Sequence, residues 1–242
     1  MRFSRLLPLF VVGISVGAAA QTPSAPPAPV ARTYDEATLK RFEAAKPVNP
    51  VVWQGDPYAF YADKPDQLVL PKATVCALKF TDAAKSRYRL QTYADASSAR
   101  ADAAHVTHQG PCGTCSTLQD LVVYLRKPDL TAPVSRCGML SAVKSLAMSC
   151  LREIGFTEAC AETWYYNARN TARQCFATCM WSWLKDEPSN KPDGNLNACL
   201  ECDETQSGPV FKKVAGRSRR ASGIVSSIGR PNDEVYPLVH DY

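Results

Sequence analysis

Apolar and polar positions alternate in two short runs in the first half of the chain. In residues 74–80, TVCALKF, the side chains of Cys76, Leu78 and Phe80 fall on one face of an expected strand. Residues 88–93, YRLQTY, alternate in the same way. A period of two residues places alternate side chains on opposite faces of a sheet, so both runs predict β-strands.

A short helix and a third strand are predicted next to these two runs. Residues 96–104, ASSARADAA, predict a helix capped by Ser97 or Ser98, and residues 105–108, HVTH, predict a brief strand. Together these segments predict a β-β-α-β element. Before it, residues 35–45 predict a helix that ends ahead of a proline.

The second half of the chain has the longer spacing of helices. Residues 115–127 predict a helix that Pro128 ends. Residues 138–154 predict another, which ends at Gly155, a residue free to take a positive φ. The apolar stripe of this second helix consists of Leu140, Val143, Ala147, Cys150, Leu151 and Ile154.

Residues 157–185 contain neither glycine nor proline and predict one long helix capped by Thr157. Within it, Cys175 and Cys179 point the same way one turn apart, so they are placed to reach two different partners, with the preceding helix as a candidate. The predicted apolar face consists of Cys160, Trp164, Ala168, Ala172, Cys175, Cys179 and Trp183.

The aromatic residues of this long helix are expected in the core. They are Trp164, Tyr165, Tyr166, Trp181 and Trp183. Trp181 lies off the apolar face, which leaves it exposed or packed on the N-terminal element. A groove for a hydrophobic ligand is the alternative interpretation.

The fold class expected from these patterns is mainly α (α+β), a disulfide-stapled helical domain with a small β-containing N-terminal part. Residues 1–20 have two arginines, an apolar run and an Ala-Ala-Ala end, as in a signal peptide. Residues 21–33 are a Pro/Ala-rich linker with little to bury. Residues 34–242 are expected to form a single cysteine-rich globular domain.

All ten cysteines follow the expected signal peptide, and an even count in an exported chain predicts a disulfide framework. Their connectivity does not follow from the sequence. Each bridge is expected to stabilise the fold by roughly 2–4 kcal/mol. The expected disulfide cysteines are Cys76, Cys112, Cys115, Cys137, Cys150, Cys160, Cys175, Cys179, Cys199 and Cys202.

Cys112 and Cys115 form a C-x-x-C motif, with Gly113 between them, just before a predicted helix. A helix N-terminus would lower the pKa of a thiol there. This strand–turn–helix setting is similar to that of thioredoxin-like oxidoreductases, and the resemblance is confined to residues 105–121. The motif has three interpretations: structural cystines, a redox dithiol or a metal site. A second C-x-x-C, at Cys199 and Cys202, could join the first in a zinc site with four thiolate ligands.

The chain has three histidines: His105, His108 and His240. They would supply a copper or zinc site if the C-terminal tail folded back beside residue 105. Residues three apart in a regular strand face opposite sides, so His105 and His108 would share a metal only where the backbone turns. Histidines held by backbone hydrogen bonds are the alternative.

Charge adds one candidate site. Basic residues gather near the C-terminus and would bind an anionic ligand or surface, or form a solvated face; they are Lys212, Lys213, Arg217, Arg219 and Arg220. Removing the two arginines of the signal peptide takes the formal charge from +5 to +3, which gives no argument for nucleic acid.

Three functions stay open from the sequence. The first is an exported, disulfide-rich binding or interaction protein, secreted or periplasmic, with no transmembrane segment in its mature chain. The second is a metal-dependent protein that uses the histidines. The third is a thiol–disulfide oxidoreductase that uses Cys112 and Cys115.

Overall fold

The computed structural model describes residues 33–70, 73–229 and 235–242. The expected signal peptide, residues 1–20, lies outside these residues, as does the expected linker up to residue 32. The expectation that residues 34–242 form one domain stays a prediction.

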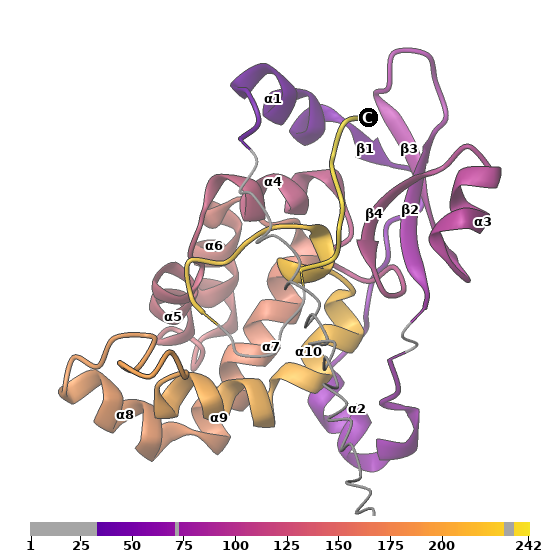
Figure 1. Ribbon diagram of the computed structural model, residues 1–242. Coiled ribbons are helices and arrows are strands. Elements are labelled where there is room, and N and C mark those ends of the chain that lie inside the picture. Colours follow the sequence, from indigo (N-terminus) through magenta and orange to yellow (C-terminus); the bar gives the residue numbers. More distant parts are fainter. Residues whose placement is uncertain (1–32, 71–72, 230–234) are drawn as a thin grey trace, which may run out of the picture.

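A small mixed sheet forms the β part of the molecule (Figure 1). Its strand order is β1-β3-β2-β4, with β1 parallel to β3 and the other two pairs antiparallel. The strands are β1 (Lys46–Pro47), β2 (Val75–Phe80), β3 (Arg87–Tyr93) and β4 (His105–Gln109). The predicted β-β-α-β element is therefore confirmed.

The central strand β2 is buried on both faces because helices cover both sides of the sheet. Cys76 and Leu78 pack in one apolar cluster with residues of α1 and α4, whereas Val75 and Ala77 pack with Ala99 of α3. The alternation of TVCALKF thus distributes its side chains between two layers of core. The covering helices are α1 (Glu36–Ala44), α3 (Ala96–Ala101) and α4 (Leu118–Arg126).

The N-cap of α3 differs from the sequence prediction. Asp95 caps the helix, and its carboxylate accepts hydrogen bonds from the backbone N–H of Ser98 at 2.7 Å and the hydroxyl of Ser97 at 2.6 Å. The two serines are therefore donors to the cap. A carboxylate at this position also interacts favourably with the positive end of the helix.

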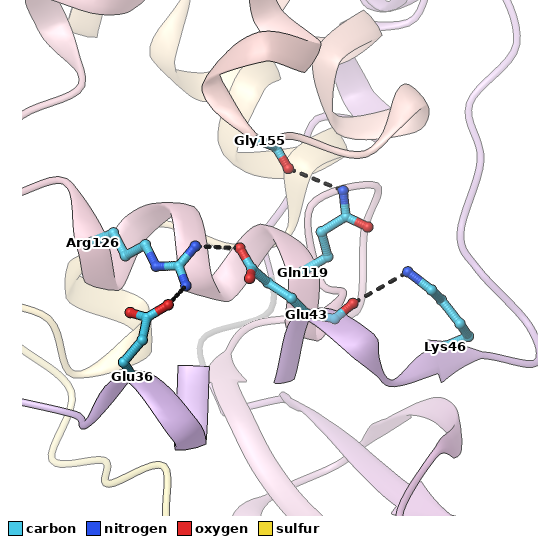
Figure 2. Close-up of polar contacts among 6 residues, drawn as sticks. All are labelled: Glu36, Glu43, Lys46, Gln119, Arg126 and Gly155. Atoms are coloured by element: carbon cyan, nitrogen blue, oxygen red, sulfur yellow. Dashed lines mark hydrogen bonds and ion pairs between the residues drawn. The ribbon is translucent and has the colours of Figure 1, made fainter. Parts of the chain in front are cut away.

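Charged side chains join α1 to α4 across their exposed sides (Figure 2). Arg126, in the last turn of α4, contacts Glu36 at 2.7 Å and Glu43 at 2.5 Å, both on α1. At the other end of α4, the side chain of Gln119 donates to the carbonyl of Gly155 at 3.0 Å. These contacts fix α4 between the sheet layer and the helical part.

The helical part packs around α7 and α10, which lie at its centre in Figure 1. Its largest apolar cluster includes Tyr124, Leu151, Phe156 and Cys160. The helices are α2 (Pro57–Asp63), α5 (Thr131–Gly138), α6 (Lys144–Ile154), α7 (Glu158–Gln174), α8 (Phe176–Leu184), α9 (Ala198–Gln206) and α10 (Gly208–Ala215), with short 3-10 turns at Pro65–Gln67 and Arg220–Ser222.

The helix predicted over residues 138–154 is wrong in its first part. The chain ends α5 at Gly138, makes a series of tight turns, and starts α6 at Lys144. Leu140 and Val143, expected on the buried stripe, are exposed. The bridge between Cys137 and Cys150 requires the turn, because 13 helical residues would hold the two cysteines about 20 Å apart.

The long helix predicted over residues 157–185 is also divided. Helix α7 ends at Gln174, and Cys175 has φ −117° and ψ 11°, outside the range of a regular helix. Helix α8 then continues in a new direction from Phe176. The break moves Trp183, expected in the core, to the surface.

Five disulfides hold the structure, and no cysteine among the described residues is free. The partners of Cys175 and Cys179 lie on the following helix, α9, rather than on the preceding one. The pairs are Cys76–Cys112, Cys115–Cys160, Cys137–Cys150, Cys175–Cys202 and Cys179–Cys199. Together with the mixed helical and strand content, they confirm the fold class predicted from the sequence.

Disulfides in such number are typical of proteins that fold in an oxidising compartment. In the part of the chain that the structure describes, no helix is long and apolar enough to cross a bilayer.

Candidate binding surface

The C-G-T-C segment is a packed turn. Thr114 and Cys115 donate backbone hydrogen bonds to the carbonyls of Val214 and Ala215 at the end of α10. A Cβ on Gly113 would lie 2.4 Å from the carbonyl oxygen of Val214, so only glycine fits there. The glycine of this motif is therefore explained by the close approach of two chain segments.

The two cysteines of this motif do not form a dithiol pair. Cys112 is bonded to Cys76 on β2, and Cys115, fully buried, is bonded to Cys160 on α7. Helix α4 begins at Leu118, so Cys112 is not at its first turn and the helix dipole does not act on it as expected. This arrangement gives the oxidoreductase hypothesis neither a paired dithiol nor an accessible sulfur at Cys115.

The register of β4 places two histidines on the same face of the sheet. His108 lies opposite Cys76 and His105 lies opposite Leu78, while Thr107 is an extra residue where the register shifts. Cys76 and Leu78 face the same core cluster, so the shift overturns the expectation that the two histidines point to opposite sides. The irregularity also frees the carbonyl of Thr107 for another partner.

The C-terminal tail returns to this face. The ring of Tyr242 lies between two histidines, with centroids 5.4 Å from His105 and 5.7 Å from His240. The backbone N–H of His240 donates to the hydroxyl of Tyr34. The tail therefore returns beside residue 105, as the three-histidine metal site would require, but the ring of Tyr242 contacts both His105 and His240.

The ring nitrogens of the two buried histidines, however, are already hydrogen-bonded. In His108, Nδ1 donates to the carbonyl of Gln109 at 2.8 Å, so Nε2 accepts from the hydroxyl of Ser116 at 2.7 Å. Burial lowers the pKa of His108 well below its ordinary value, and the nearby Arg217 adds to the shift. His108 is therefore a neutral, structural histidine.

His240 is held in the same way. Its Nε2 donates to the carbonyl of Ser222 at 2.9 Å, and its Nδ1 accepts from the hydroxyl of Tyr242 at 2.8 Å. Burial lowers its pKa to about 3, with a further contribution from Arg217. Across the described residues, no group of three or more histidine, cysteine, aspartate or glutamate side chains is arranged to hold a metal ion, so the copper or zinc hypothesis has no ligand set there.

Arg217 lies at the centre of this buried region, although the sequence placed it in a surface patch. Its side chain is fully buried and donates five hydrogen bonds, one for each of its N–H groups. The acceptors are the carbonyl oxygens of Cys115, Thr107 and Ser116 and the hydroxyl oxygens of Thr107 and Ser222. The guanidinium thus joins β4, the C-G-T-C turn and the segment after α10.

Asp120 is the buried carboxylate beside this network. It accepts hydrogen bonds from the backbone N–H and the hydroxyl of Thr157 and from the hydroxyl of Thr117. Burial raises its pKa to about 6, against the effect of these hydrogen bonds. Asp120 therefore ties the start of α4 to the start of α7.

The other basic residues of the proposed anion site are spread over the molecule. Lys212 pairs with Glu204 at 3.3 Å, and Lys213 donates to the carbonyl of Val69 at 2.6 Å. Arg219 donates to backbone carbonyls at the end of α4. Arg220 is half-buried in the 3-10 turn Arg220–Ser222. With Arg217 buried, the five cations do not form one exposed patch.

Helix α8 presents an unusual surface. From Phe176 to Leu184 it contains no charged residue. Cys175, just before the helix, and Ser182 are buried, whereas the large side chains on the other side face solvent; Trp181 is 63% exposed and Trp183 is 74% exposed. We call the exposed set the α8 stripe; it consists of Phe176, Met180, Trp181, Trp183 and Leu184.

The size of the α8 stripe sets it apart from scattered exposed apolar residues. Its five side chains expose on the order of 600 Å² together. On a typical monomer the largest apolar patch is about 300–600 Å² and is often functional. Other exposed apolar residues include Met139 and Val143 on the connection between α5 and α6, Leu146 on α6, and Val52 before α2.

Two disulfides fix the orientation of α8. Cys175 and Cys179 are bonded to Cys202 and Cys199 of α9, so both helices form a hairpin crosslinked at two levels. Figure 1 shows α8 at the lower left, at the end of the helical part away from the sheet. A shallow open hollow of about 550 Å³ lies beside it, lined by Trp181, Lys185 and Ala198 among others.

The sequence contained a signal for this surface that the helix prediction concealed. A nine-residue helix without a charged residue is apolar on every side, which is typical of a buried helix or one that meets a partner. The fold and its surface thus define a disulfide-braced α+β protein with an exposed apolar helix.

Residues 144–238 match the model of a family of unknown function, DUF8771. The similarity covers the helical part from α6 onward, including α8, α9 and Arg217, and less than half of the chain. No curated protein matches the chain, and no solved structure does.

Proposed function

We propose that this protein is an exported binding module, secreted or periplasmic, that contacts its partner through the α8 stripe. The observation that carries this proposal is the exposure of five large apolar side chains on a helix without charge. Burying such a surface against a partner is favourable by roughly 25 cal/mol per Å² before the costs of association. Aromatic residues and methionine are enriched at protein interfaces, as they are here.

The disulfides support a binding role because they prepare the surface in advance. The two bridges between α8 and α9 restrict α8 to one orientation, so little conformational entropy is lost when a partner binds. The two other hypotheses lack a comparable feature, because His108, His240 and the C-G-T-C cysteines are held in internal contacts, and the exposed His105 belongs to no metal-ligand group among the described residues.

A photo-crosslinking experiment tests this proposal. Benzoyl-phenylalanine is placed at Trp183 or, as a control, at Gln91, an exposed position on β3, and the protein is irradiated in the cells that produce it. We expect an adduct from position 183, none from position 91, and loss of the adduct when Met180→Glu is added to the first variant. Equal labelling from both positions, or no adduct from any position of the α8 stripe, would overturn the proposal.

A further inference from the structure

We infer that the partner of the α8 stripe is the same stripe on a second copy of this chain, in a symmetric dimer with α8 antiparallel to α8. This inference rests on the proposed function and names its partner. It is carried by the row of apolar side chains centred on the midpoint of α8, by the area of the stripe, and by the charges at the two ends of the helix.

Trp181 and Trp183 of the α8 stripe both lie in the C-terminal half of the helix, but the row of Phe176, Met180 and Leu184 is centred on Met180. This residue is the midpoint of Phe176–Leu184, with four residues on each side. At about 100° per residue, Phe176, Met180 and Leu184 form one row along the helix, and the two tryptophans lie on either side of that row. A two-fold axis through Met180 therefore places Phe176 of each copy against Leu184 of the other.

A two-fold interface must be complementary to itself, because the same surface serves on both subunits. The absence of charge between Phe176 and Leu184 meets this condition, since no like charges face each other across the axis. The tryptophans can pack on either side of the facing row, as ridges pack into grooves in paired helices. A helix of nine residues, about 13 Å long, is short enough to be covered completely by its mate.

The area is close to that of a stable dimer. A specific interface buries about 800 Å² on each partner, of which the five side chains of the stripe supply on the order of 600 Å². The remainder is the expected polar rim from the residues at both ends of α8.

The charges at the ends of α8 complement each other in the antiparallel arrangement. The exposed Arg173 precedes the helix, whereas Lys185, Asp186 and Glu187 follow it and together carry one net negative charge. The two-fold axis brings the basic end of each copy to the acidic end of the other. The same acidic residues, with Glu201 exposed on α9, disfavour an anionic membrane as the occupant.

Charge reversal at the axis tests the inference directly. In Met180→Glu two carboxylates face each other at the axis, and in Met180→Lys two ammonium groups do. Like charges at this distance should raise the dissociation constant of the dimer about 100-fold in each variant. Mixing the two variants should restore a dimer that contains one copy of each.

The measurement is sedimentation velocity of the purified, oxidised protein over a range of concentrations, with far-UV circular dichroism and a count of free thiols to show that each variant is folded. Val52→Glu and Val52→Lys are matched controls, because Val52 is an exposed apolar residue outside the α8 stripe. Both controls should associate like the wild type.

Two outcomes would overturn the inference. A wild-type protein that stays monomeric up to about 100 μM has no dimer of useful affinity. A dimer that Met180→Glu and Met180→Lys leave intact, or that their mixture does not restore, uses another surface. If the protein is monomeric while position 183 still crosslinks in cells to another protein, or α8 holds it on phosphatidylcholine vesicles, the second copy is excluded and the binding role of the α8 stripe stands.

Discussion

Arg217 and the α8 stripe lie at opposite extremes of solvent exposure. A charged side chain is buried at the first, and large apolar side chains are exposed at the second. The guanidinium of Arg217 is completely buried, while two tryptophans of α8 are mostly exposed. All five N–H groups of Arg217 have acceptors within the protein. Among the described residues, the exposed side chains of the α8 stripe have no such hydrogen-bond partners.

This difference in exposure distinguishes a residue that stabilises the fold from a surface that binds a partner, a distinction that the sequence did not show. A buried charge is tolerated only when its hydrogen bonds are satisfied, so Arg217 belongs to the stability of the fold. An exposed apolar surface contributes little to the stability of the fold, and a patch of this size is typical of a site where a partner binds. Substitutions at the two places should therefore change different quantities.

The largest effect is expected at Arg217. Arg217→Met removes five hydrogen bonds and leaves three buried carbonyl groups without their donor, which should lower the free energy of unfolding by about 4 kcal/mol. Arg217→Lys should also destabilise, because an ammonium group cannot reproduce the planar fork of donors. Urea unfolding at neutral pH measures both; unchanged stability would show that the network is not needed.

Gly113→Ala should have the next largest effect. The added Cβ would lie 2.4 Å from the carbonyl oxygen of Val214, and relieving this clash should cost about 2–3 kcal/mol. Gly208→Ala is the matched control, since its Cβ would meet its nearest neighbour at an ordinary distance of 3.5 Å. Thermal unfolding of both variants should show a drop only for the first.

Stability should fall on acidification because of the buried histidines. The pKa of His240 is about 3 in the fold and 6.5 when the chain is unfolded, so below pH 6.5 the unfolded state binds a proton that the folded state does not. At pH 5 this costs about 2 kcal/mol relative to pH 7. The lowered pKa of His108 acts in the same direction.

Asp120 opposes this trend in part. Its pKa is raised to about 6, so its contribution is largest at low pH and is lost as the pH rises toward 6. The net result is still a loss of stability between pH 7 and pH 5, which denaturant titrations at the two pH values measure. His240→Asn should reduce the dependence, and an equal slope in this variant would contradict the assignment.

A smaller effect is expected for the ion pairs between α1 and α4 (Figure 2). Arg126→Ala should lower the free energy of unfolding by about 0.5–1 kcal/mol, because the pairs with Glu36 and Glu43 are partly solvated. The loss should shrink in 1 M salt. A double-mutant cycle with Glu43→Ala isolates the stronger contact and should show a positive coupling.

The smallest effect on stability is expected on the α8 stripe. Trp183→Ser should change the free energy of unfolding by less than about 0.5 kcal/mol, since the side chain is 74% exposed. The same variant should weaken self-association strongly in sedimentation experiments. A large loss of stability here would show that Trp183 serves the fold and would remove the contrast with Arg217.

The sequence was a good guide where a local period controls the structure. The strands around Cys76 and Leu78, the helix after the C-G-T-C turn and the positive φ of Gly155 all followed from spacing and turn chemistry. The presence of disulfides followed from the even count of cysteines and from the expected export signal.

The rest depends on contacts between distant residues. The extra residue Thr107 in β4 and the break at Cys175 carry no local signal, and both change which side chains face outward. Arg217 lies among other cations along the chain, and only its acceptors on β4 and the C-G-T-C turn explain its burial. Trp183 of the α8 stripe was predicted in the core because the expected helix was continuous, and Trp181 was expected off the apolar face of that helix.

The connectivity of the sulfurs bears on how the chain matures as it emerges, N-terminus first, into the oxidising environment in which its disulfides form. The five bonds are sequential or nested, and no closed loop interlocks with another: Cys137–Cys150 lies within Cys115–Cys160, and Cys179–Cys199 lies within Cys175–Cys202. Each cysteine can therefore form its disulfide as soon as its partner has emerged, and no later residue has to pass through a loop that is already closed. The last loop to close holds α8, so the apolar helix acquires its fixed orientation only after the β part and the first helices have already emerged.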